Sequence, residues 1–481
     1  MSISEKAQIL QNIKPENVFR YFREICAVPH GSGNTKKISD YCVSNAGRLG
    51  LWCRQDEFDN VIIKKPASAG YEQKDAVILQ GHLDMVCEKE ADCDIDFENE
   101  GLRLLTDGDY IFADGTTLGG DDGIAVAMIL ALLEDSTAVH PTLYAVFTSD
   151  EETGMTGAAN IDLSDIRADM LINIDSEEEG VLTVSCAGGA KCHINLPLES
   201  QLCIGSVFEM KVHGLSGGHS GVEIDKGIPN ADIVAVELLK FMQRRFDFSL
   251  CDIAGGLKDN AIPRECTVVI ESNIDYSEVI SVCADFISEF SPSMTQTPLI
   301  SVNKGVSEHS FNRESTDRII EFLSTVPNGV VKMSDSIPGL VQTSLNLGIL
   351  YCKSNELYST IAVRSSDNIE KEALISELEN ISKNYGGKMS IDGRYPAWEY
   401  RENSRLRECM VSVFEQMFMK EPVVGAVHAG LECGLLSGKI NNLDAVSFGP
   451  DILDIHTPKE RLDIKSTERM YNYLKEVLKE L

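Results

Sequence analysis

The chain has 481 residues, with 43 lysines and arginines against 75 aspartates and glutamates, so its formal net charge is −32 at pH 7. Such an acidic chain repels polyanions, and because no basic patch interrupts the sequence, we exclude a nucleic-acid-binding protein. Hydrophobic residues make up 43% of the chain, which is enough for a sizeable core, and the length predicts two or three domains.

The sequence carries no targeting or membrane-spanning signal. Its N-terminus, MSISEKAQILQ, lacks the basic and apolar regions of a signal peptide, and no run of 18 apolar residues occurs. The 14 cysteines are few for this length and never stand at C-x-x-C spacing. We therefore expect reduced thiols and a cytoplasmic protein that does not contact membranes.

The first part of the chain alternates short apolar runs with a helical pattern. Residues 75–80, 142–149 and 169–174 are predicted strands. Residues 123–135 are a predicted helix, because this apolar segment is too long for a typical strand and contains no breaker. Such alternation is typical of an α/β domain with parallel strands covered by helices.

After residues 186–190 the pattern changes. Strands at 206–214 and 265–274 are interleaved with helices such as 231–246, which predicts an inserted α+β domain. A helix at 405–418, a strand at 444–449 and a terminal helix from about Ser466 then resume the first pattern. We expect one domain over 1–188 and 398–481, interrupted by an inserted domain over 189–397.

Ionisable residues follow each predicted strand of the first segment. GHLD (81–84), SDEE (149–152) and DSEEE (175–179) come directly after the three apolar runs, and the loop LGGDDG precedes the predicted helix. Because the carboxyl ends of parallel strands lie along one edge of an open sheet, these side chains should meet in one crevice. The expected cluster consists of His82, Asp84, Asp121, Glu151, Glu152 and Asp175.

So many carboxylates in a small volume cannot all ionise without a counter-charge, which a metal would supply. A mixture of imidazole and carboxylate ligands favours Zn²⁺, with Co²⁺ or Mn²⁺ as alternatives, over Ca²⁺ or Mg²⁺. The cluster offers more ligands than one catalytic zinc needs, whereas two ions about 3.5–4 Å apart that share a carboxylate would use them all. The sequence therefore predicts two divalent metal ions.

Local sequence leaves simpler interpretations open. His82 could be a hydrogen-bonded structural histidine that Asp84 orients. Asp121 and Asp122 could cap the following helix, and Glu151 with Glu152 could be a solvated loop. Glu177, Glu178 and Glu179 are interpreted as solvent-facing charges. The glycine-rich segment 114–123 lacks the phosphate-loop pattern, and its two aspartates would repel an anion.

These motifs together resemble the M20 metallopeptidases and, within that family, the aminoacyl-histidine dipeptidase (peptidase D, Xaa-His dipeptidase) group. The resemblance spans nearly the whole chain. It is carried by GHLDMV (81–86), DGTTLGGDDGIAVA (114–127), TSDEETGMTGA (148–158), LINIDSEEEG (171–180), SGGHSG (216–221), HAGLECG (428–434) and FGPDILDIHTP (448–458).

The resemblance implies a zinc-peptidase-like catalytic domain, with a mixed, mostly parallel sheet covered by helices, and an inserted α+β lid domain. It also implies Glu151 as general base and Asp84 as the catalytic helper of His82. Asp122 stands where relatives often carry asparagine. The implied metal ligands are His82 with Glu152 on one side, Asp175 on the other, Asp121 as the bridge and His456 completing the second site.

The inserted domain would then contribute substrate contacts. His219 is a candidate oxyanion donor, acting within its own chain or across a dimer. Arg364 and Asn260 resemble residues that read the substrate's α-carboxylate, for which an arginine fork is well suited. His428 and Gly430 are expected to line the substrate side of the cleft, and Glu432 is interpreted as structural.

The resulting hypothesis is a metal-dependent dipeptidase that hydrolyses Xaa-His and other dipeptides through a hydroxide bridging two metal ions. One alternative is an M20 aminoacylase or carboxypeptidase acting on N-acyl amino acids or longer peptides. Another is a non-catalytic metal-binding homologue, which the complete ligand set disfavours. The expected partners are small peptides, together with a second copy of the chain if the inserted domain forms a homodimer.

Overall fold

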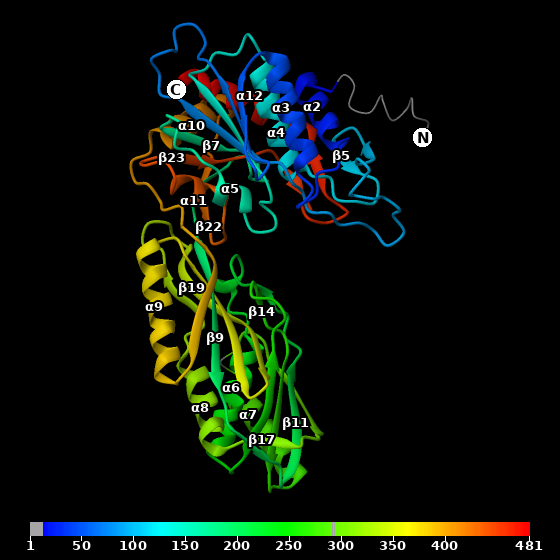
Figure 1. Cartoon of the computed structure of the whole chain (residues 1–481), viewed down its shortest axis with the longest axis vertical. Helices are drawn as coiled ribbons and strands as arrows, with labels where there is room; N and C mark the ends of the chain where they lie inside the picture. Colours follow the sequence, from blue (N-terminus) through cyan, green and yellow to red (C-terminus); the bar gives the residue numbers. More distant parts are fainter. Residues whose placement is uncertain (1–12, 291, 293) are drawn as a thin grey trace. The chain divides into compact units, whose positions relative to one another are not determined.

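The structure is a computed structural model that describes residues 13–290, 292 and 294–481 (Figure 1). The N-terminal segment MSISEKAQILQ (1–11), in which no signal peptide was expected, lies outside these residues. The chain divides into two compact units, one formed by the chain up to Ser185 with Tyr400–Ala426 and Leu431–Leu481, the other by Cys186–Glu399 with Val427–Gly430. The predicted boundaries at 188 and 397 differ from these by a few residues, and residues 427–430, which the prediction assigned to the first domain, belong to the second unit.

The first unit is built on an eight-stranded mixed sheet with the order β1-β2-β6-β3-β7-β23-β8-β22. β3 pairs in parallel with β6 and β7, and β23 pairs in parallel with β7, whereas β1, β2 and β6 pair antiparallel. The strands are β1 (Trp52–Gln55), β2 (Val61–Lys65), β3 (Val77–His82), β6 (Leu143–Thr148), β7 (Met170–Asn173), β8 (Val181–Cys186), β22 (Val423–Val427) and β23 (Asp444–Ser447). This mixed sheet, in which the neighbouring strands β6, β3, β7 and β23 run parallel, confirms the predicted fold class.

Helices cover this sheet, and a small four-stranded sheet accompanies it. The helices are α2 (Glu16–Cys26), α3 (Lys36–Leu49), α4 (Gly120–Glu134), α5 (Thr156–Asn160), α10 (Arg405–Phe418), α11 (Glu432–Ser437) and α12 (Ile464–Glu480). The small sheet contains β4 (Leu104–Thr106), β5 (Tyr110–Ala113), β24 (Ile452–Leu453) and β25 (Arg461–Asp463). The predicted helix at 405–418 is α10, and the predicted terminal helix is α12.

The apolar runs of this unit form strands and a helix that are buried on all sides. Every residue of β3 and β6 is buried, as expected for parallel strands covered on both faces. α4 is buried along almost its whole length and packs against α2 and α3, beside which it runs in Figure 1. A helix that is apolar all round belongs in a core. The predicted helix at 123–135 is this element.

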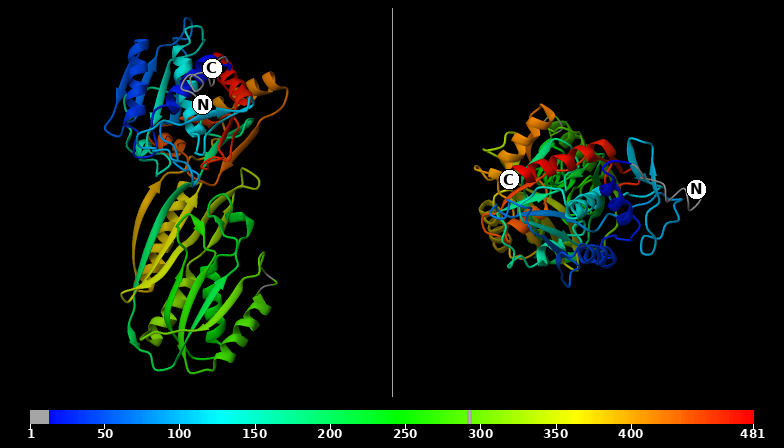
Figure 2. Two further views of the ribbon diagram at one scale, coloured as in Figure 1. Left: turned by 90° about the vertical axis from the view of Figure 1, so that its right-hand side faces the viewer. Right: turned by 90° about the horizontal axis from the view of Figure 1, so that it is seen from above.

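The second unit is α+β, as predicted, with an antiparallel sheet of order β16-β11-β15-β13-β19-β20-β9-β21 and β18 beside β19. Its strands are β9 (Gly188–Pro197), β11 (Ser206–His213), β13 (Ser249–Gly255), β15 (Cys266–Ser272), β16 (Leu299–Lys304), β18 (Gly329–Met333), β19 (Val341–Lys353), β20 (Glu356–Ser365) and β21 (Lys388–Tyr395). Two short ladders pair β10 (Ser200–Leu202) with β17 (His309–Phe311) and β12 (Gly218–His219) with β14 (Ala261–Ile262). In Figure 2, β9 and β21 run side by side.

The described α-helices of this second unit are α6 (Ala231–Gln243), α7 (Tyr276–Phe290), α8 (Arg313–Thr325) and α9 (Asn368–Asn384). Each unit has its own hydrophobic cluster, so each buries its own core. Within the described part of the chain, no helix combines the length and the apolar character that crossing a membrane requires.

Candidate metal centre

The ionisable residues of the first unit do meet at one edge of its sheet. His82 ends β3, the glutamate pair follows β6, and Asp175 follows β7. β3 lies between the other two strands, with Gln80 opposite Asn173 and His82 opposite Thr148. Since the three strands run parallel and in register, their carboxyl ends present these side chains side by side, as the sequence analysis expected.

Asp121 enters this cluster from the start of α4. The backbone of Asp121 and Asp122 is not helical, and the peptide bond between them is cis. Asp121 Oδ1 lies 3.0 Å from His82 Nε2, and Asp175 Oδ1 lies 3.6 Å from the same nitrogen. His82, Asp121 and Asp175 therefore form one group that could hold a metal ion, with all ligand atoms within 4.8 Å of one another.

The other oxygen of Asp121 belongs to a second group. Asp121 Oδ2 lies 3.1 Å from Nε2 of His456, and Glu152 Oε1 lies 2.8 Å from the same nitrogen. His456 follows β24 in a left-handed backbone conformation, with φ of 59°. Asp121, Glu152 and His456 thus form a second potential metal site, which shares Asp121 with the first.

This arrangement pairs the ligands differently from the resemblance-based expectation. That expectation put His82 and Glu152 on one side and Asp175 on the other, whereas Asp175 lies against His82 and Glu152 lies against His456. The physical reason is the position of Asp121, because its two carboxylate oxygens face different imidazoles and so separate the remaining ligands. A helix cap, the simpler interpretation of Asp121, does not describe these contacts.

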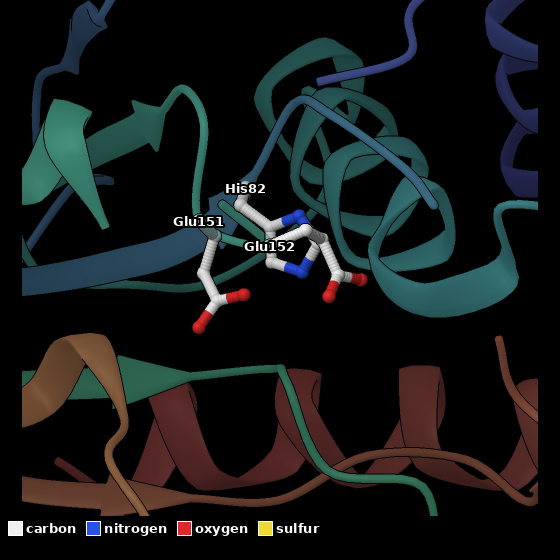
Figure 3. A group of neighbouring side chains, drawn as sticks. All are labelled: His82, Glu151 and Glu152. Atoms are coloured by element: carbon white, nitrogen blue, oxygen red, sulfur yellow. The ribbon is translucent and has the colours of Figure 1, made fainter. Parts of the chain in front are cut away.

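Glu151 and Glu152 point in different directions from one loop. In Figure 3 their carboxylates lie on opposite sides of the His82 ring, and the three residues form a third potential ligand group. The carboxylate of Glu152 forms an ion pair with the His456 imidazole, as described above. Glu151 has no such ion-pair partner among the described residues, which leaves its carboxylate available for proton transfer.

Asp84 holds this loop and the histidine together. Its Oδ1 accepts a hydrogen bond from the backbone N–H of Glu151 (3.0 Å), and its Oδ2 accepts from Ser32 Oγ (2.8 Å) and from the backbone N–H of Glu152 (3.3 Å). The Nδ1 atom of His82 lies 3.0 Å from the Asp84 carbonyl and 3.6 Å from its carboxylate. Donation by Nδ1–H leaves Nε2 facing the carboxylates, the orientation that a metal ligand needs.

Burial and charge shift the pKa values of these groups strongly. Burial alone would lower the pKa of His82, but hydrogen bonds to Asp121, Asp175 and Asp84 raise it well above the usual value. Hydrogen bonds to Asp121 and Glu152 raise the pKa of His456 to about 10. Without metal, the two imidazoles are therefore protonated near neutral pH and neutralise part of the cluster.

The pKa values of the carboxylates shift in opposite directions. Burial raises the pKa of Asp175 to about 6 and raises that of Glu151 well above its usual range, with nearby carboxylates adding to the effect on both. Burial by itself would raise the pKa of Asp121. The hydrogen bonds from His456 and His82 outweigh this effect, so the pKa of Asp121 is lowered. The group between the imidazoles thus stays ionised, whereas burial favours the protonated form of Glu151.

Glu460 is a buried carboxyl residue next to Asp121 that no sequence motif indicated. Its carboxylate accepts hydrogen bonds from the backbone N–H groups of residues 118, 119, 120 and 121, at 2.8–3.4 Å. The N–H groups of the glycine-rich loop are therefore satisfied by a carboxyl side chain of the same chain rather than by a phosphate, and burial raises the pKa of this carboxyl group to about 7. No local signal identifies Glu460, because its partners are more than 300 positions away.

Glu432 is a second buried carboxylate beneath the site. Its Oε2 accepts hydrogen bonds from Gln80 Nε2 (2.5 Å) and Thr148 Oγ1 (2.6 Å), and Gln80 Oε1 in turn accepts from Asn173 Nδ2 (2.6 Å). This network joins β3, β6 and β7 just before the residues of the cluster, so the structural role expected for Glu432 is to fix the spacing of the strand ends. Burial raises the pKa of Glu432 to about 7.

The expectation of solvent-facing charges at 177–179 is wrong for two of the three residues. Burial raises the pKa of Glu177 to about 8, with Asp175 and Asp121 adding to the shift. Glu179 forms a two-pronged ion pair with Arg469, at 2.7 and 2.6 Å. Glu178 alone is exposed. Glu177 is thus close to the cluster, whereas Glu179 contacts Arg469 and, through its backbone N–H, Asp451.

His219, in the second unit, is held in a defined tautomer. Its Nδ1 accepts hydrogen bonds from the backbone N–H groups of Gly221 (3.1 Å) and Val222 (3.2 Å). Nε2 therefore carries the ring proton and can donate it. Burial lowers the pKa of His219, and the charge of Arg364 lowers it further, so the imidazole is neutral near pH 7.

The other predicted substrate residues lie around His219 in the same unit. His428 Nε2 lies 2.7 Å from Ser344 Oγ, and burial together with the charges of Arg364 and His219 lowers its pKa to about 4. The carbonyl of Asn260 accepts a hydrogen bond from the backbone N–H next to His219, but its side chain is exposed. Gly430 packs against Tyr395. These residues all belong to the second unit.

A family model described as peptidase family M20/M25/M40 matches residues 78–480, which is most of the chain and includes both ligand groups. This chain belongs to peptidase family M20. The shared Asp121, the two histidines and the glutamate pair of this M20 peptidase all lie inside the matched range.

Relatives of this M20 peptidase match it along nearly its whole length. The cytosol non-specific dipeptidase of Escherichia coli (strain K12) is 35% identical over 479 residues, covering 98% of this chain and 99% of that protein. The crystal structure of aminoacylhistidine dipeptidase from Vibrio alginolyticus superimposes with a TM-score of 0.91 at 31% identity, covering 100% of this chain and 99% of that one. Aminopeptidase PepT from Bacillus cereus shares the fold, with a TM-score of 0.58 at 15% identity.

Gly81 is tightly packed and directly precedes His82, a candidate metal ligand. A Cβ atom there would lie 2.5 Å from Asp122 Oδ2, which accepts the backbone N–H of His82. We expect Gly81→Ala to lower the free energy of unfolding by about 1–3 kcal/mol and to weaken metal binding, because His82 must move. Denaturant unfolding and metal content after dialysis measure both effects. Gly47→Ala is the control, since its Cβ would meet open space; an equal loss there would contradict the argument.

Glu460→Gln tests the anion that holds the Asp121 loop. The amide keeps the shape but loses the charge and half of the acceptor capacity for the loop N–H groups. We expect the free energy of unfolding to fall by about 1.5–3 kcal/mol and metal affinity to fall about tenfold or more. Isothermal titration with Zn²⁺ measures the affinity. Glu408→Gln, at an exposed helical position, should change neither quantity. An unchanged affinity in Glu460→Gln would remove Glu460 from this role.

Proposed function

We propose that this M20 peptidase is a metal-dependent dipeptidase with two metal sites that share Asp121. The observation that carries the proposal is the division of the two Asp121 oxygens between His82 and His456, which yields two groups of three ligands. Two imidazoles and several carboxylates favour Zn²⁺, with Co²⁺ or Mn²⁺ as alternatives. When bound, such ions would lower the pKa of water and polarise the peptide carbonyl.

The ligand set suits metal ions for a physical reason that is independent of the family. Asp175, Glu177 and Glu432 all have raised pKa values, because burial and mutual repulsion oppose their ionisation. Divalent cations would relieve that repulsion and displace the protons from the two imidazoles. The carboxylates of Asp121, Glu152 and Asp175 and the Nε2 atoms of His82 and His456 would be the ligand atoms.

Glu151 is the proposed general base. It accepts a proton from the attacking water at its carboxylate and returns that proton to the nitrogen of the leaving amine. Its raised pKa makes this carboxylate a stronger base towards the attacking water than an ordinary glutamate, and its protonated form is still acidic enough to protonate the more basic leaving amine. Asp84 positions this base through the backbone N–H of Glu151 and orients His82.

The second unit contributes substrate contacts in this proposal. The Nε2–H of His219 donates to the carbonyl oxygen as negative charge develops on it, since Nδ1 is already occupied by two backbone N–H groups. Arg364 pairs with the free α-carboxylate of the dipeptide, assisted by Asn260. His428 and Gly430 complete the lining of the substrate site. A homodimer through the inserted domain stays a prediction.

Two relatives support the substrate class and the location. One is named a cytosol non-specific dipeptidase and the other an aminoacylhistidine dipeptidase, and each matches nearly the full length of this chain. We accordingly propose dipeptides, including Xaa-His dipeptides, as substrates and the cytosol as the place of action. Preference for a C-terminal histidine is a finer point that the same substrate panel decides.

A dipeptide panel tests this function. The protein is treated with a chelator, dialysed, and measured with and without added Zn²⁺, Co²⁺ or Mn²⁺ on Xaa-His dipeptides including β-Ala-His, other dipeptides, tripeptides and N-acetyl amino acids. We expect hydrolysis of dipeptides only in the presence of metal. Preferential cleavage of N-acetyl amino acids would identify an aminoacylase, and cleavage of longer peptides a carboxypeptidase. A metal-loaded protein inactive on every compound would contradict the proposal.

Glu151→Gln tests the general base separately from metal binding. Because Glu151 lies outside the two ligand groups that share Asp121, we expect the variant to retain two metal ions per chain and to lose about 10²–10⁴-fold in kcat. Metal analysis and dipeptide hydrolysis measure the two quantities. Glu178→Gln, three residues after Asp175 and exposed, is the matched control and should keep full activity. Near-normal turnover in Glu151→Gln would exclude this role.

A further inference from the structure

Three neighbouring strands of the second unit bring an arginine and a tyrosine together across a glycine. In the sheet, β9 lies between β20 and β21, with Arg364 opposite Gly189 and Gly189 opposite Tyr395. Residues opposite one another in neighbouring strands share a face of the sheet. Since Gly189 has no side chain, the two flanking side chains can meet above it, and Arg364 Nη1 donates a hydrogen bond of 3.2 Å to the hydroxyl oxygen of Tyr395.

The space for the tyrosine ring is formed by two glycines. A Cβ atom on Gly189 would lie 2.6 Å from the Tyr395 hydroxyl oxygen, and one on Gly430 would lie 2.7 Å from the ring. The backbone of Tyr395 is fixed as well, because its carbonyl accepts a 2.6 Å hydrogen bond from the buried Lys371 ammonium. The ring therefore occupies a defined slot beside Arg364 rather than a loose surface position.

Arg364 and Tyr395 each keep a hydrogen-bond donor that is not used in their contact with one another. The Tyr395 hydroxyl accepts from Arg364, so its own proton is free to donate. Burial raises the pKa of Tyr395, which keeps that proton in place at neutral pH. The Nε–H of Arg364 is buried and has no hydrogen-bond partner among the described residues. A cation with an unused buried donor beside a phenolic donor fits a carboxylate, which has two oxygens to accept them.

The neighbouring histidines do not compete for this anion as cations. The charge of Arg364 adds to burial in lowering the pKa values of both His219 and His428. Both imidazoles are therefore neutral near pH 7, and Arg364 carries the positive charge among these three side chains. A bound anion at this place would be held by the guanidinium and by whatever neutral donors point towards it.

We propose that Tyr395 is a specificity-determining residue for the free carboxylate of the substrate, holding the Arg364 guanidinium in place and donating its hydroxyl proton to a carboxylate oxygen. This inference rests on the proposed dipeptidase function and adds a residue to it. It also explains why residues 189 and 430 are glycines, because a side chain at either position would collide with the Tyr395 ring. The interpretation to be distinguished from it is that Tyr395 only fills space between strands.

Tyr395→Phe separates the two interpretations, because it keeps the ring in its slot and removes only the hydroxyl. The substrates are alanyl-histidine, with a free carboxylate, and alanyl-histidinamide, which lacks it. We expect the wild type to prefer the acid by about 100-fold in kcat/KM, as an arginine-based carboxylate site should. In Tyr395→Phe, KM for the acid should rise about tenfold with kcat within about twofold, and kcat/KM for the amide should stay unchanged.

Tyr358→Phe is the matched control, because it removes a hydroxyl from β20 of the same sheet whose only hydrogen-bond contact in the described structure is to Glu356. It should leave both substrates unaffected. Gly189→Ala is a second variant that disturbs the Tyr395–Arg364 contact without altering either side chain. It should raise KM for the acid in the same way, and it decides the question if Tyr395→Phe does not fold.

The outcomes separate this inference from the proposed function. Equal losses on acid and amide, or an unchanged KM for the acid, overturn the role of Tyr395 while the dipeptidase function stands. A wild type that does not distinguish acid from amide also overturns it. If the metal-loaded wild type hydrolyses neither compound, nor any dipeptide of the panel, the dipeptidase proposal fails first and this one fails with it.

Discussion

Repulsion between buried carboxylates is the constraint on which the first unit depends. Three parallel strands and one helix start deliver their acidic residues to the same sheet edge, where burial opposes ionisation. Two imidazoles offset part of the charge, and both have raised pKa values because of the carboxylates around them. Asp121 lies between the imidazoles and stays ionised. The residual negative charge favours divalent cations at this candidate metal centre.

A supporting layer holds this unfavourable arrangement in place. Asp84 binds the loop of the two glutamates, Glu460 binds the N–H groups of the loop before Asp121, and Glu432 joins three strands beneath the site. All three are carboxylates whose hydrogen bonds come mainly from backbone or neutral side chains. The M20 peptidase thus uses acidic residues in two ways, as candidate metal ligands facing the centre and as acceptors that fix the backbone around it.

The second unit places neutral side chains around a single arginine instead of gathering carboxylates. His219 and His428 are kept uncharged by burial and by Arg364, and the guanidinium meets the Tyr395 hydroxyl over a glycine. The sheet register creates this arrangement, because the arginine, the glycine and the tyrosine come from three separate strands. A single cation among neutral donors is suited to recognise one anionic group, whereas the first unit gathers negative charge for cations.

The sequence by itself determined the alternation of strands and helices, the inserted domain and the cluster at the strand ends, because apolar runs and the residues that follow them are local patterns. The same patterns identified the family through motifs that each lie within a few residues. Three features needed the tertiary structure: the pairing of His82 with Asp175 and of Glu152 with His456, the anchoring of the glycine-rich loop by Glu460, and the contact between Arg364 and Tyr395. Each joins residues from distant segments, and which oxygen faces which nitrogen depends on strand register and loop conformation, for which no short sequence pattern exists.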